Sequence, residues 1–195
     1  MKTVSYYSLT GNQRQDFLNY LSTVTDSSPA FENMWDADWT NKPNTLPYIL
    51  ERTDKFRSPN GDYFIIYDGE LPVGMGGIYF SSFNRFIALA GVRTWVNPQY
   101  RNRALLKENL LPYHKAWAIK NNCRQVALTF NDYNKNIVEI FKRNRAGTPR
   151  LEHNLFYKGL VEVGFPVVIQ KTPQWVIYEP LDAEWQFDWR LIQAV

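Results

Sequence analysis

Val96-Asn97-Pro98-Gln99-Tyr100-Arg101-Asn102-Arg103-Ala104-Leu105-Leu106 is the stretch that decides the fold, because a strand pattern ends in it and a helix pattern begins. The apolar run from Phe86 to Val96 is longer than a typical strand, which predicts a β-bulge, with Gly91 as the candidate position. After the stretch, apolar residues recur at the spacing of one helix face, at Leu106, Leu110, Tyr113 and Trp117. Pro112 falls inside that stripe and predicts a kink or a break in the helix.

A second strand follows this helix. The segment Gln125 to Phe130 is short and almost continuously apolar, a pattern typical of a buried parallel strand. Residues Phe86 to Phe130 therefore predict a β-α-β unit, for which a right-handed crossover is expected.

The N-terminal half contains a helix and an antiparallel hairpin. Thr10 and Gln13 have the spacing of a capping box, and apolar residues at helical spacing follow, after a short first strand. The Pro-rich connection from 29 to 60 predicts short helical turns. Asp68-Gly69 predicts a hairpin turn between strands Tyr63–Tyr67 and Val73–Phe80. In the second of these strands we expect close backbone packing or a bulge at three glycines, Gly74, Gly76 and Gly77.

The C-terminal part predicts a helix over Tyr133–Arg143 and a hairpin of strands Gly164–Gln170 and Gln174–Glu179. The fold class that follows is α/β, with a mixed, mostly antiparallel sheet and one central parallel β-α-β crossover. We expect a single domain over residues 1–195, since a chain of this length forms one substantial core. An unrelated α+β sandwich is the alternative.

Composition excludes several classes of protein. The chain has 45% hydrophobic and 21% charged residues, an ordinary globular balance, and one Cys, which excludes an internal disulfide and favours a reducing, cytoplasmic location. We expect no membrane partner, because the sequence contains no run of 18 apolar residues. The net charge of +3 is weak support for nucleic acid. His114 and His153 lack ligand spacing, so no metal is expected.

The turn at 96–106 suits an anion, because the first N–H groups of a helix lack internal partners and lie at the positive end of its dipole. Arg101 and Arg103 add positive charge at the same place. An ordinary solvated helix start with two arginines is the alternative.

The order of strand, Val-x-Pro-x-Tyr-Arg, helix and strand resembles the GCN5-related N-acetyltransferase superfamily. The donor signature of that family, Arg/Gln-x-x-Gly-x-Gly/Ala, aligns with Arg101-Asn102-Arg103-Ala104-Leu105-Leu106. Arg101 matches, Ala104 replaces the first glycine, and Leu106 replaces the second small residue, where it either crowds a phosphate or points into the core. The resemblance implies that these six residues bind acetyl-CoA or another acyl-CoA as donor. It also implies that the backbone of Trp95 and Val96 contacts the pantetheine arm.

A second match begins at Asn131 and ends at Phe141, where Asn134, Ile137 and Phe141 align with the family's Asn, apolar residue and Tyr. The resemblance implies donor binding by Asn134. Phe141 has no proton to give to the leaving thiolate, so Tyr133 and Asp132 are the candidate catalytic residues in its place. A core or covering role for Tyr133 is the alternative. The implied reaction is direct attack of an amine on the thioester.

Charge segregation indicates where the acceptor binds. Acidic residues gather in 26–54 and basic ones in 99–124. We expect the acidic, Trp-bearing segment to line a site for a positively charged amine, either a small molecule or a peptide, through Trp35, Asp36, Asp38 and Trp39. A solvated acidic loop is the alternative. Two other functions stay open: a binding or structural protein that has lost transfer, and, less favoured, a nucleic-acid-binding module. A homodimer is left open too.

Overall fold

The computed structural model of the chain describes residues 1–26, 34–36, 38–43, 45–80, 85–101, 103, 105–123, 125–131, 150–152 and 174–180. Within these residues one seven-stranded sheet has the order β1-β2-β3-β4-β5-β7-β6. The strands are β1 (Lys2–Ser5), β2 (Gly61–Asp68), β3 (Leu71–Phe80), β4 (Ile87–Val96), β5 (Gln125–Asn131), β6 (Arg150–Glu152) and β7 (Gln174–Pro180). All neighbours are antiparallel except β4 and β5, which pair in parallel. The predicted fold class, α/β with a mixed and mostly antiparallel sheet, is confirmed.

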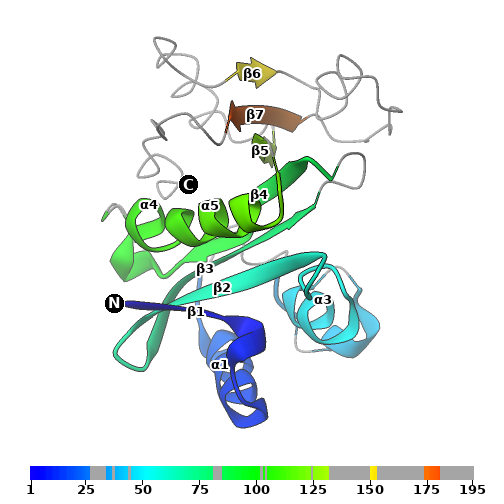
Figure 1. Ribbon diagram of the computed structural model, residues 1–195. Coiled ribbons are helices and arrows are strands. Elements are labelled where there is room, and N and C mark those ends of the chain that lie inside the picture. The colour runs from blue at the N-terminus through cyan, green and yellow to red at the C-terminus, as the bar shows by residue number, and fades with distance from the viewer. Residues whose placement is uncertain are drawn as a thin grey trace.

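Helices cover both faces of the sheet (Figure 1). The helices α4 (Leu105–Asn109) and α5 (Leu111–Lys120) connect β4 to β5 and lie on one face. The helices α1 (Gly11–Thr23) and α3 (Leu46–Arg52) lie on the other, with the short 3-10 turns η1 (Tyr6–Ser8), η2 (Trp39–Asn41) and η3 (Pro98–Tyr100) in the connections. Because both faces are covered, almost every residue of β2 and β3 is buried or partly buried.

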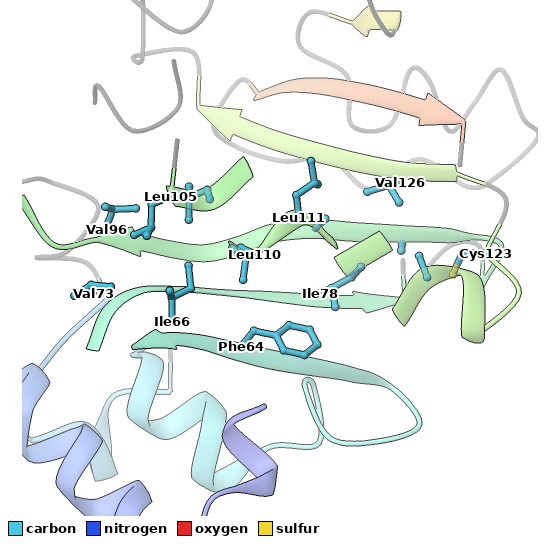
Figure 2. Packing of buried hydrophobic residues seen from close by; sticks show 14 residues of the cluster. Phe64, Ile66, Val73, Ile78, Val96, Leu105, Leu110, Leu111, Cys123 and Val126 are labelled. Carbon is cyan, nitrogen blue, oxygen red and sulfur yellow. The ribbon is translucent and has the colours of Figure 1, made fainter. Parts of the chain in front are cut away.

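Two hydrophobic cores hold the three layers together. The first lies between the sheet and α4 and α5, and Figure 2 shows Leu105, Leu110 and Leu111 from the helix side meeting Ile66 and Ile78 of the strands. Cys123 belongs to this core and is 7% exposed, as expected for a small core residue. The second core gathers aromatic and aliphatic side chains of η1, α1 and α3 against the opposite face of the sheet.

The local predictions for helix ends are confirmed. Thr10 Oγ1 accepts from Gln13 N at 3.4 Å and Gln13 Oε1 accepts from Thr10 N at 3.0 Å, which completes the capping box of α1. The helical stripe breaks at Leu110, so α4 and α5 are separate helices and Pro112 stands in the first turn of the second one.

Close packing surrounds the three glycines of β3, and a Cβ built on Gly74 would lie 2.9 Å from Cδ2 of Leu105. A Cβ built on Gly77 would lie 2.3 Å from Cε1 of Phe56, and one on Gly76 would lie 2.7 Å from Oγ1 of Thr94. The absence of a side chain lets Phe56 of the second core approach the strand at Gly77, and at Gly76 it leaves room for Thr94 of the neighbouring strand β4. Of the C-terminal elements, the predicted strand 174–179 is observed as β7, whereas the predicted helix 133–143 and strand 164–170 lie outside the described residues. The short strand β6 was not predicted.

Candidate functional site

The two central strands pair over only part of their length. β4 and β5 are in register from Ile87↔Gln125 to Ala90↔Leu128. Beyond Ala90, β4 continues to Val96 against β3 alone, and β5 continues to Asn131 against β7. The parallel pair therefore separates toward the carboxyl ends of its strands. In the described part of the chain, β4 from Gly91 onward has no strand partner on the β5 side.

An irregularity in β4 marks the place where the strands separate. Gly91 has φ 67° and Arg93 has φ 54°, and the β3–β4 register shifts between Met75 and Gly77 and again at Ile78. The bulge expected near Gly91 is confirmed. The hydroxyl of the fully buried Tyr63 donates to the carbonyl oxygen of Arg93 at 2.7 Å and so holds the irregular backbone in place.

Asn97 organises the turn that follows β4. Its Oδ1 accepts from Gln99 N at 3.0 Å and caps η3, while its backbone N–H donates to Val73 O at 2.9 Å. Its Nδ2 donates to the hydroxyl of Tyr20 at 3.1 Å, which ties the turn to α1.

Arg101 forms a partly buried ion pair with Asp26. Its Nη2 lies 2.6 Å from Oδ2 of Asp26, whose side chain is 5% exposed, and its Nε donates to Val96 O at 3.2 Å. The indole N–H of Trp95 donates to the same carboxylate oxygen at 2.7 Å. The carboxylate therefore joins the segment after α1 to the end of β4 and to the turn. In the sequence Asp26 belongs to the acidic segment, and no local signal marks its role with a partner 75 positions away.

The other predicted donor-binding residues divide into exposed and buried ones. Arg103 is exposed, and its guanidinium lies 5.2 Å from the ring centroid of Tyr100, whose hydroxyl donates to Asp68 Oδ2 at 2.8 Å. That hydrogen bond is the main cause that raises the pKa of Tyr100 above its usual value. Leu105 and Leu106 are each 1% exposed and belong to the core beneath α4. Of the two expectations for Leu106, the structure places its side chain in the core.

Five predicted site residues lie outside the described residues. They are Asn102 and Ala104 in the turn, and Asp132, Tyr133 and Asn134 after β5. The last described residue before the two candidate catalytic residues is Asn131, at the end of β5.

Two carboxylates of the acidic, Trp-bearing segment, Asp36 and Asp38, have partners nearby in the sequence. Asp36 Oδ2 lies 2.5 Å from Lys42 Nζ, and this hydrogen bond is the main cause that lowers the pKa of Asp36. Asp38 accepts from Asn41 Nδ2 at 3.0 Å and from the hydroxyl of Thr40. Trp35 packs partly buried against the second core, and the ring of Trp39 lies 5.8 Å from the Arg52 guanidinium. Each of these four predicted residues therefore already has a partner within the chain.

A pocket of about 560 Å³ lies elsewhere, between β1, α1 and the turn joining β2 to β3. Its lining mixes apolar residues with Lys2, Gln13, Asp16 and Glu70, and none of the predicted site residues contributes to it. The described residues contain no cluster of three or more side chains suited to a metal ion. Among them, no helix is long and apolar enough to cross a membrane.

Comparison with known proteins gives a result for the fold. The sequence matches no protein-family model and no curated protein. The structure is similar to an acetyltransferase of the GNAT family from Staphylococcus aureus Mu50, with a TM-score of 0.55, 14% identity, and coverage of 91% of this chain and 98% of the other. It is also similar to a probable acetyltransferase from Staphylococcus epidermidis ATCC 12228, with a TM-score of 0.54, 10% identity, and coverage of 92% of this chain and 98% of the other. A third similar structure is the ribosomal-protein-S18-alanine N-acetyltransferase from Escherichia coli, with a TM-score of 0.51, 10% identity, and coverage of 95% of this chain and 96% of the other.

Identities this low establish the architecture alone. The chain has the fold of the GCN5-related N-acetyltransferases.

Proposed function

We propose that this protein transfers an acyl group from acetyl-CoA, or from another acyl-CoA, to an amine. The observation that carries the proposal is the separation of β4 from β5 after the Ala90–Leu128 pair, in a fold shared with acetyltransferases. Beyond Ala90, the side of β4 that faces β5 is the proposed place for backbone contacts with an extended ligand that carries amide groups, in the way that a peptide adds a strand to a sheet edge. We assign this contact with the pantetheine arm to the backbone of Trp95 and Val96.

The turn after β4 is the proposed site for the phosphates of the donor. Arg103 is exposed and supplies positive charge there, whereas Arg101 orders the turn through Asp26 and Val96. The core position of Leu106 supports this assignment, because its side chain does not crowd the turn and only its backbone faces a ligand. Asn102, Ala104, Leu105 and, after β5, Asn134 complete the proposed contacts.

In the proposed reaction the main contribution of the protein is to position the two substrates. An acyl-CoA thioester supplies an activated carbonyl, and transfer forms a C–N bond and breaks the C–S bond. The chain holds amine and thioester together and excludes water, which lowers the barrier without a strong base. A proton leaves the amine and one reaches the sulfur, and we assign these transfers to Asp132 and Tyr133 at the end of β5.

The acceptor is proposed to be the amine of a small molecule or a peptide. The acidic segment with Trp35, Asp36, Asp38 and Trp39 stays the proposed wall of the acceptor site. Asp36 and Asp38 are paired locally. We therefore expect the segment to contribute to acceptor binding through its shape and the aromatic surface of its tryptophans more than through free negative charge.

Release of free CoA thiol from acetyl-CoA in the presence of a panel of amines tests the proposal. We expect amine-dependent thiol release in the wild type and a reduced rate in Tyr133→Phe with an unchanged KM for acetyl-CoA. Tyr113→Phe is the matched control, because it removes the same phenol hydroxyl from an exposed side chain of α5 that lies outside the proposed contacts. Donor binding without release for every amine would favour a protein that keeps the fold and has lost transfer.

A further inference from the structure

The pocket between β1, α1 and the turn that joins β2 to β3 is a second candidate site. Its volume of about 560 Å³ lies within the roughly 300–1,000 Å³ that is typical of ligand pockets. Every residue that lines it belongs to the described part of the chain. None of them is a proposed donor, acceptor or catalytic residue, so the function proposed above leaves this pocket unused.

One face of α1 forms a long wall of the pocket. Gln13, Asp16, Phe17 and Tyr20 all line it, and their spacing of three, four and seven positions places them on the same side of a helix. The capping box fixes the first turn of this helix through Gln13. The helix therefore presents two rings and a carboxylate to the pocket in a set order.

The inner surface of the pocket is apolar. Phe17 belongs to the second core and is 2% exposed, and Val4 and Leu9 pack partly buried against the same core. Pro72 is buried as well, whereas Leu71 at the hairpin turn stays 37% exposed. A ligand with an apolar body would remove this surface from water, which favours binding.

The charged groups of the lining have a net negative charge. Asp16 and Glu70 carry carboxylates, and Lys2 carries the one ammonium among the lining residues. Lys2 lies opposite Tyr67 in the β1–β2 register. Burial, and then the charge of Asp16, raises the pKa of Tyr67, in agreement with a carboxylate on the same side of the pocket as this half-buried phenol.

Both ends of the pocket are tied to the turn after β4. The hydroxyl of Tyr20 accepts from Asn97 Nδ2 at 3.1 Å. Next to the lining residue Gly69, Asp68 Oδ2 accepts from the hydroxyl of Tyr100 at 2.8 Å. These contacts hold α1 and the hairpin turn in place, so the pocket is formed before a ligand arrives, which lowers the entropic cost of binding.

We infer that this pocket binds a small molecule that has an apolar, aromatic body and a protonated amine. The body packs on Phe17 and Leu71, and the amine receives charge-assisted hydrogen bonds from Asp16 and Glu70. The face of a tyrosine ring attracts the same cation. The inference goes beyond the proposed acyl transfer and does not depend on it.

Three compounds with the same ring test the preference for positive charge: 2-phenylethylamine, neutral 2-phenylethanol and anionic 3-phenylpropionate. Their Kd values for the full chain are measured by ligand-observed NMR titration at pH 7, low ionic strength and without acetyl-CoA. We expect the amine to bind about five-fold more tightly than the alcohol and about ten-fold more tightly than the acid, as two exposed carboxylates allow.

Variants in the lining locate the site. Asp16→Asn and Glu70→Gln each remove a charge from an exposed side chain, and each should lower the preference for the amine over the alcohol to about two-fold. The double variant should abolish it. Leu71→Ser should weaken the amine and the alcohol alike, because it removes apolar contact and leaves the charges.

Matched controls remove the same groups elsewhere. Asp54→Asn lies in the loop before β2 and Glu108→Gln in α4, both at exposed positions, and each should leave the preference unchanged. Equal binding of the amine and the acid, or no binding of any compound at millimolar concentration, would overturn the inference. So would an unchanged preference in the double variant, and its loss in Asp36→Asn instead would place the amine at the acidic, Trp-bearing segment.

Discussion

His114 makes the stability of the fold sensitive to acid. The side chain comes from α5, is 0% exposed, and lies in the core between Gly76 O, 3.3 Å from Nε2, and the ring of Phe64, 5.7 Å between centroids. Nδ1 has no hydrogen-bond partner among the described residues. Burial is the main cause that lowers the pKa of His114 to about 4, and the Gly76 carbonyl opposes it weakly.

The sign and size of the effect follow from linkage. The folded chain binds this proton only near pH 4, whereas the unfolded chain binds it near pH 6.5, so acid favours unfolding. The stability owed to neutral His114 is complete above pH 6.5 and is lost progressively as pH falls from 6.5 toward 4. Since one pKa unit is worth ~1.4 kcal/mol, the loss is about 2 kcal/mol between pH 7 and pH 5, and about 3 kcal/mol by pH 4.

His114→Gln isolates this contribution. The amide can still donate to Gly76 O but carries no charge at any pH, and carboxylate effects cancel when variant and wild type are compared. Urea unfolding followed by tryptophan fluorescence at pH 7, 6 and 5 gives the two free energies of unfolding. Between pH 7 and pH 5 we expect the free energy of unfolding to fall by about 2 kcal/mol more in the wild type than in the variant. Parallel pH profiles would refute the reasoning, and His153→Gln measures the share of the other histidine.

Three further predictions concern packing and polar contacts, each measured by urea unfolding. Asp26→Asn should cost about 3 kcal/mol by leaving Arg101 without its partner, and a double-mutant cycle with Arg101→Gln should show coupling, whereas additive losses would argue against the pair. Gly77→Ala should lower the free energy of unfolding by about 1–3 kcal/mol, because its Cβ would lie 2.3 Å from an aromatic carbon. Gly11→Ala, with nothing within 4 Å of the added Cβ, should be neutral or stabilising. Similar losses in both variants would contradict the packing argument. Thr10→Ala should cost about 1 kcal/mol through the capping box, and Thr10→Asn should retain most of that stability if the cap is the cause.

Local chemistry explains the parts of the fold that were predictable. The Asp68-Gly69 turn needs a positive φ, which Gly69 supplies at 60°, and the strands on both sides follow from it. The break before Pro112 follows from the missing N–H of proline and from its fit in the first turn of α5. Both features depend on residues within a few positions of one another.

The site was less predictable because its contacts are long-range. Arg101 was expected to bind phosphate from its place in a motif, yet its guanidinium is held by Asp26, and no spacing rule connects the two residues. Arg93 lies within the strand predicted over 86–96, and its left-handed φ of 54° is accompanied by a hydrogen bond to its carbonyl oxygen from Tyr63, which is 30 positions away. Tertiary packing decides both environments.

Thermal unfolding with and without acetyl-CoA, with free CoA and ATP as controls, tests the central claim most directly, since it needs no knowledge of the acceptor. A ligand at one hundred times its Kd adds about 2.7 kcal/mol, and each kcal/mol moves Tm by about 2–4 °C in a chain of this size. The account predicts a rise of several degrees with acetyl-CoA and a smaller one with ATP. An unchanged Tm at millimolar acetyl-CoA would contradict a donor site along β4.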